Sequence, residues 1–123
     1  MDAQLVAALC RIEGVEQSPS MFSTDDALWC NGSEIAHSDG PGVIDLRLTK
    51  AVIKELRQSL RDDPRVTLRR GTSDWMQVHC TVRDLGFVVE LVERAVAAHR
   101  RVPGEVSKPP PTGPDLERRR RLH

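Results

Sequence analysis

The stretch SEIAHSDGPGVIDLRLT, from Ser33 to Thr49, places one histidine among several carboxylates. A histidine beside a carboxylate is held in one tautomer and titrates near neutral pH, which suits a general base. His37 with Asp39 or Asp45 is therefore the candidate catalytic group of a small hydrolase or oxidoreductase. A metal site needs three or four converging ligands, and no helical HxxxH or comparable spacing supplies them. We expect no metal and no cofactor.

A second candidate site follows from the alternation of side chains along the expected strands. Successive strand residues face opposite sides of a sheet. If the apolar positions of residues 43–48, 66–70 and 75–82 face the helices, a tryptophan and several polar groups share the other face. A tryptophan among hydrogen-bonding groups can stack on a planar ligand or anchor a partner, and the alternative is an ordinary solvated sheet. The predicted ligand- or partner-binding residues are Asp45, Arg47, Arg69, Trp75, Gln77 and His79.

The same alternation gives His37 the parity of Ile35 and so predicts that it faces the helices. Glu34 and Ala36 are then expected to point outward. Asp39 and Asp45 would reach His37 only if the turn at Gly40-Pro41-Gly42 bends the strand ends together.

The elements that position these residues follow from apolar periodicity and turn signals. Residues 3–13 and 48–63 carry helical stripes, and Thr49 is the expected N-cap of the second. Asn31-Gly32 predicts a hairpin with a type I′ turn, and residues 43–48 add a third strand. Thr81 and Asp84 have the spacing of a capping box ahead of a helix from Leu85. This helix and a second hairpin over 65–82 complete the order α-β-β-β-α-β-β-α. We therefore expect an α+β fold of two layers, with about five antiparallel strands and three helices on one face.

The chain divides into an expected domain over 1–101 and a Pro- and Arg-rich segment over 102–123, interpreted as a disordered tail. The tail carries a net charge of +2 and the rest of the chain −2. A folded part without net positive charge argues against phosphate-backbone binding as its main task. Weak nucleic-acid binding through Arg118, Arg119, Arg120 and Arg121 stays open.

Cysteine usage and hydropathy indicate the compartment. Cys10, Cys30 and Cys80 are odd in number and form no CxxC spacing, which favours free thiols. No signal-peptide pattern and no run of membrane-spanning length is seen. These features predict a cytoplasmic location without membrane contact. No GxSxG elbow or phosphate-binding loop motif points to an enzyme.

Three segments carry a resemblance to a known family: GSEIAHSDGPGVIDLRLT, DPRVTLRRGTSDWMQV and the closing Leu/Val-rich helix. Over roughly Ala3 to Arg101 the chain resembles small bacterial luciferase-domain proteins. The family pattern often has a second histidine where Asp39 stands here. The layout is also similar to that of MmcQ/YjbR-like double-wing proteins, some of which are suspected of binding DNA.

The leading functional hypothesis is a non-enzymatic module that binds a protein or a small molecule on the face bearing Trp75. The alternatives are the small enzyme built on His37 and the weak nucleic-acid binder.

Overall fold

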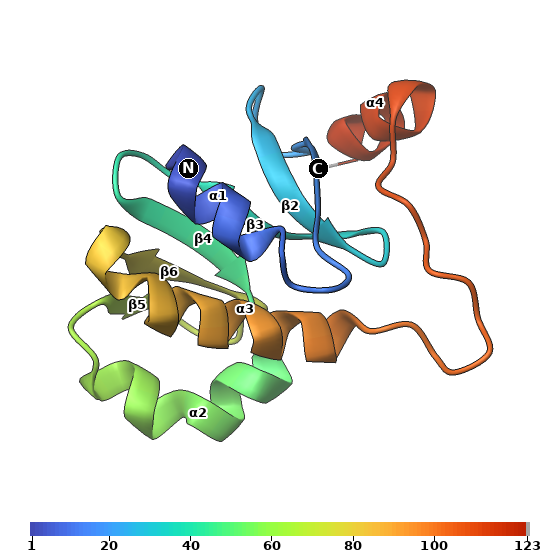
Figure 1. Cartoon of the computed structure of the whole chain (residues 1–123). Coiled ribbons are helices and arrows are strands. Elements are labelled where there is room, and N and C mark those ends of the chain that lie inside the picture. Colours follow the sequence, from blue (N-terminus) through green and yellow to red (C-terminus); the bar gives the residue numbers. More distant parts are fainter. Residues whose placement is uncertain (123) are drawn as a thin grey trace.

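A computed structural model describes residues 1–122 as a mixed α+β fold built on one antiparallel sheet (Figure 1). The sheet has six strands in the order β1-β2-β3-β4-β6-β5. Its elements, in chain order, are α1 (Ala3–Leu9), β1 (Glu16–Pro19), β2 (Asp26–Cys30), β3 (Ser33–Ser38), β4 (Val43–Arg47), α2 (Lys50–Asp62), β5 (Val66–Leu68), β6 (Trp75–His79), the 3-10 turn η1 (Val82–Asp84), α3 (Leu85–His99) and α4 (Gly113–Arg121).

The strands form where turn chemistry predicted them, with one addition. Asn31 and Gly32 both have positive φ, as the expected type I′ turn between β2 and β3 requires. The added strand is β1, in a segment for which the sequence predicts no strand. Its last residue is Pro19, and proline is tolerated there because β1 is an edge strand.

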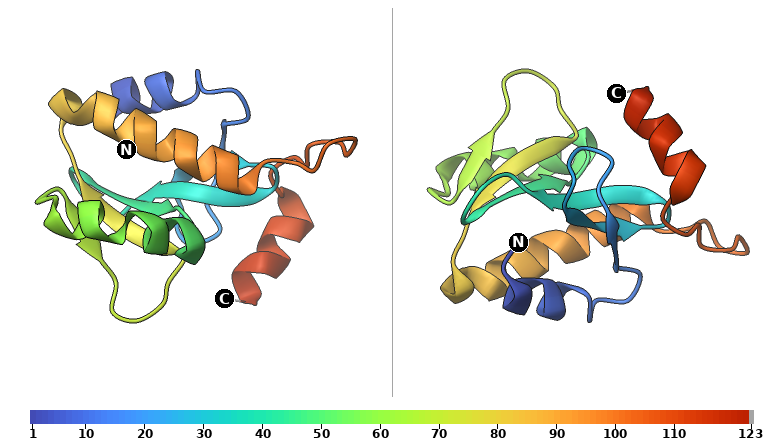
Figure 2. Two further views of the ribbon diagram at one scale, coloured as in Figure 1. Left: turned by 90° about the horizontal axis from the view of Figure 1, so that it is seen from below. Right: turned by 90° about the horizontal axis from the view of Figure 1, so that it is seen from above.

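Three helices supply apolar side chains to a single core on one side of the sheet. Leu9 of α1, Ile53 of α2 and Val92 of α3 belong to the same cluster as the sheet residues Leu46 and Met76. The side chain of Thr49 accepts a hydrogen bond from Val52 N, which confirms the predicted N-cap of α2. Figure 2 shows α1 and α3 together on this face. We call it the helix face, and the opposite one the outer face.

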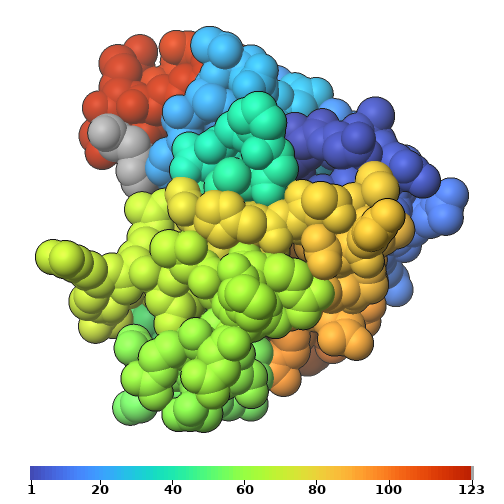
Figure 3. Space-filling view, turned by 90° about the vertical axis from the view of Figure 1, so that its left-hand side faces the viewer, coloured from blue at the N-terminus to red at the C-terminus, as the bar shows by residue number. Residues whose placement is uncertain are grey.

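A fourth helix lies on the outer face, in the segment expected to be a disordered tail. Leu116 of α4 is only 5% exposed and packs with Trp29 and Ala27 of β2, and Met21 lies against this small cluster. Figure 3 shows α4 on one side of the strands and α1 and α3 on the other. The sequence pattern does not predict this helix, because its one buried apolar residue is Leu116 and the rest of the segment is rich in proline and arginine.

A β-bulge in β3 overturns the predicted orientation of His37. Leu28 pairs with Ala36 and Trp29 with Glu34, so Ile35 is the extra residue on β3. Ile35 and Ala36 are consequently both in the helix-face core. His37 then pairs with Asp45 on the outer face. No residue pattern marks the extra residue, so strict alternation predicts the wrong faces for His37 and Ala36.

The end of the second predicted hairpin also differs. β6 ends at His79, and Val82, expected to face the helices, begins a 3-10 turn and is 56% exposed. The capping box of Thr81 and Asp84 is present, as the sequence indicated. No helix within residues 1–122 is long and apolar enough to cross a membrane.

Candidate functional site

A chain of alternating charges runs across the outer face from β3 to the end of β5. Glu34 Oε2 lies 2.9 Å from His37 Nδ1, and His37 Nε2 lies 3.1 Å from Asp45 Oδ2. Asp45 Oδ1 accepts a hydrogen bond from an Arg69 guanidinium nitrogen at 3.3 Å. The bulge at Ile35 makes this possible, because residues three apart on a regular strand face opposite sides. We call these four residues the ionic chain.

Glu34 also fixes the loop between β1 and β2. Although its side chain is a carboxylate, Glu34 is only 1% exposed. Ser20 Oγ donates to Oε2 at 2.8 Å, and the Met21 backbone N–H donates to Oε1 at 2.7 Å. Ser20 Oγ in turn accepts from the Phe22 N–H at 3.0 Å. A buried carboxylate is costly unless its oxygens are partnered, and here both oxygens are.

Both ring nitrogens of His37 face carboxylates. The histidine side chain is 13% exposed. Burial lowers the pKa of His37, but the carboxylates of Glu34 and Asp45 outweigh this effect and raise it above the ordinary histidine value. Nδ1 has no well-aligned hydrogen bond among the described residues, so its contact with Glu34 is mainly electrostatic. A histidine held in this way stabilises the ionic chain and leaves no nitrogen facing a substrate.

Three rings pack together beside the ionic chain. The His37 ring centroid lies 5.3 Å from that of Phe22 and 5.0 Å from that of Trp75. Phe22 meets Trp75 edge-on at 5.5 Å. Trp75 is half-buried, whereas Phe22 is 44% exposed. The β1–β2 loop therefore holds an aromatic ring at the surface against a tryptophan of the sheet.

A groove of about 440 Å³ opens at these rings, and we call it the aromatic groove. It lies on the outer face, where the β5–β6 loop and α4 project on the same side of the sheet (Figure 2). Its size falls in the range of small-molecule sites. The lining residues include Phe22, Glu34, Arg47, Asp74, Trp75 and Arg119.

The outer-face residues predicted from the sequence do share one face, but they form more than one contact set. Arg47 lies 6.0 Å from the Trp75 ring and 3.6 Å from Asp74. Gln77 donates to Asp39 rather than to the ionic chain. His79 Nε2 lies 3.2 Å from Thr67 Oγ1 at the exposed end of β6. Trp75 and Arg47 thus line the groove, whereas Asp45 and Arg69 belong to the ionic chain. Gln77 and His79 do not line the groove.

Of the two candidate catalytic pairs, His37 with Asp39 or with Asp45, the structure brings together one. His37 meets Asp45, as one version of the hypothesis required. Asp39 instead accepts the Gln77 amide at the β3–β4 turn. Within residues 1–122, no group of three or more histidine, cysteine or acidic residues is placed to hold a metal ion.

The arginine cluster contacts the protein itself. Arg119 donates to Gly32 O at 2.9 Å, and Arg120 donates to Ser20 O at 2.8 Å. Arg118 pairs with Asp115 within α4. Three of the four arginines proposed for nucleic-acid contact therefore hold α4 in place or stabilise it.

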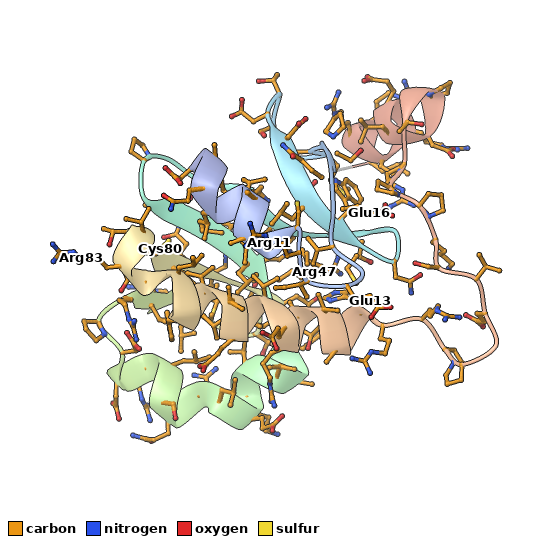
Figure 4. The ribbon with its side chains drawn as sticks, viewed as in Figure 1. Arg11, Glu13, Glu16, Arg47, Cys80 and Arg83 are labelled. Atoms are coloured by element: carbon orange, nitrogen blue, oxygen red, sulfur yellow. The ribbon has the colours of Figure 1, made fainter. Side chains whose placement is uncertain are left out.

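The cysteines lie away from the aromatic groove. All three are free, and burial raises the pKa of the Cys80 thiol, which disfavours the reactive thiolate. Figure 4 shows Cys80 near the start of α3, well separated from Arg47 beside the other half of that helix.

Sequence reasoning missed Ser20, Phe22 and Glu34 as site residues. Ser20 and Phe22 fall in a segment that carries no periodic pattern. Glu34 was correctly expected to point outward, yet its burial depends on a loop and a helix that come from distant parts of the chain. Comparisons with protein-family models, curated proteins and solved structures found no match for this chain.

Proposed function

We propose that this protein is a small, non-enzymatic binding module that takes a planar heteroaromatic molecule in the aromatic groove. The observation that carries the proposal is the exposed Phe22 ring, which the buried Glu34 holds in place next to Trp75. A fully partnered buried carboxylate that fixes an exposed aromatic residue is the kind of support that preorganised sites have. A rigid aromatic wall binds planar rings with little loss of side-chain freedom.

The polar groups of the groove suit the same ligand class. Arg47 and Arg119 offer guanidinium donors at the groove, and Asp74 pairs with Arg47. A ligand with ring nitrogens or carbonyl oxygens would find donors there.

The enzyme alternative is less well supported, because His37 already has a carboxylate at each ring nitrogen. A general base needs a nitrogen within reach of the substrate proton. The likeness to luciferase-domain proteins stays a proposal, and the function proposed here does not rest on it.

The two tryptophans provide the test of this function. Adenosine, guanosine and 2-naphthoate are titrated while NMR follows the indole N–H signals of Trp75 and Trp29. We expect at least one compound to shift the Trp75 signal, with Kd on the order of 1 mM. The Trp29 signal should shift less, since Trp29 is fully buried beneath α4 and does not line the groove.

Two variants define the site. Phe22→Ala should weaken binding about threefold to tenfold, in line with the free energy of an aromatic pair. Val106→Ala, at a position 87% exposed, should bind like the wild type. If none of the compounds shifts the Trp75 signal up to about 10 mM, or if Phe22→Ala binds equally well, the proposal is wrong.

A further inference from the structure

A second groove, of about 340 Å³, lies between α2 and the loop that joins β5 to β6. Lys50, Lys54 and Arg57 line it from the helix, and Arg69 lines it from the end of β5. The α2 residues recur at spacings of four and three, so they project from one side of the helix. Figure 3 shows both α2 and this loop at the surface. We call this the cationic groove.

The cationic groove has no acidic side chain among its lining residues. Within residues 1–122, Lys50, Lys54 and Arg57 form no ion pair, while Arg69 shares its charge with Asp45. Elsewhere on α2, Glu55 pairs with Arg94. Like charges at these helical spacings repel and destabilise a helix. The arrangement therefore costs stability and leaves three cations to neutralise an incoming anion.

The loop opposite α2 adds uncharged donors. Thr72 and Ser73 carry hydroxyl groups there, and Gly71 has a φ of +70° that lets the backbone turn sharply. Hydroxyl groups and lysine or arginine side chains are the usual partners of phosphate oxygens.

Trp75 lines both grooves and so connects them. A planar group in the aromatic groove would bring an attached anion within reach of the cations on α2. Resting on the proposed function, we propose that the cationic groove binds phosphate, so that the whole site takes a phosphorylated planar molecule such as a nucleotide.

The first experiment uses inorganic pyrophosphate alone, titrated into the full chain by calorimetry at low and high salt. We expect saturable binding that weakens as salt rises, because exposed charges are screened. The double variant Lys54→Gln/Arg57→Gln should lose at least about tenfold in affinity. Arg83→Gln, which removes an exposed cation outside the groove, should bind like the wild type. Absence of pyrophosphate binding, or equal binding by the double variant, would overturn the proposal.

The second experiment compares adenosine 5′-diphosphate with adenosine. We expect the diphosphate to bind about tenfold tighter, and the double variant to reduce it to the affinity of adenosine. Phe22→Ala, at a residue that lines only the aromatic groove, should weaken adenosine binding and leave pyrophosphate binding unchanged. Pyrophosphate binding without nucleoside binding would mean that the proposed function fails while the phosphate site stands. The reverse result would remove the phosphate site alone.

Discussion

At the scale of single residues, the outer face depends on a carboxylate that its surroundings almost completely bury. Glu34 contacts the Ser20 hydroxyl and the Met21 backbone N–H in the β1–β2 loop, and the His37 ring on β3. Removing one member of such a set leaves the other charges buried without partners, which costs more than the contact itself contributed. His37 is the link between Glu34 and Asp45, so its charge state affects the whole ionic chain.

His37 should make the stability of the protein depend on pH. Its pKa is raised in the folded state, so its contribution is fully present below the unfolded pKa of about 6.5. The contribution is lost as pH rises through the folded pKa. Chemical denaturation of the wild type and His37→Gln should therefore show the largest difference in unfolding free energy near pH 6, shrinking at higher pH.

The subtraction isolates His37 from the other histidines. Burial lowers the pKa of His99, which acts in the opposite direction, but His99 is present in both proteins and cancels. A difference that grows from pH 6 to pH 9 would contradict the assignment.

At the scale of elements, the sequence predicts what local rules control. The Asn31-Gly32 turn, the Thr49 cap and the capping box of Thr81 and Asp84 all depend on neighbouring residues, and all are present. The bulge at Ile35 and the docking of Leu116 depend on contacts between distant segments. Apolar periodicity along the chain carries no information about such contacts. The predictions that His37 faces the helices and that the tail is disordered were therefore wrong.

The helix α4 should contribute measurably to stability despite its single buried anchor. Leu116→Ala removes apolar contacts with Trp29. We expect the free energy of unfolding to fall by about 2 kcal/mol, at the low end for buried leucines because the cluster around Leu116 is small. Trp29 should also become accessible to acrylamide, which a Trp75→Phe background would reveal by fluorescence quenching. Leu122→Ala, at a position 80% exposed, is the matched control and should change neither property.

At the scale of the whole molecule, the two faces of the sheet have different roles. The helix face holds the main core, with the apolar sides of α1, α2 and α3, and the outer face holds the ionic chain and the rings of Phe22 and Trp75. Because the sheet separates them, substitutions in the aromatic groove should leave the main core in place.

Hydrogen exchange should reveal the corresponding order of stability. Amides of β4, which is paired on both sides by β3 and β6, should exchange most slowly. Those of the edge strands β1 and β5 and of α4 should exchange sooner, because fewer contacts hold them. If α4 amides were as protected as those of β4, the helix would belong to the main cooperative unit.

The clamp formed by the arginines of α4 joins very distant parts of the chain. Arg120 reaches Ser20 across 100 residues, and Arg119 reaches Gly32 across 87. Loop-closure entropy must be overcome before contacts of this separation stabilise the fold, so we expect them to form late during folding. The sheet and its main core should therefore assemble first, with Trp29 still in water. The aromatic groove gains its Arg119 wall only in the final step, so ligand binding should report the completion of folding rather than its onset.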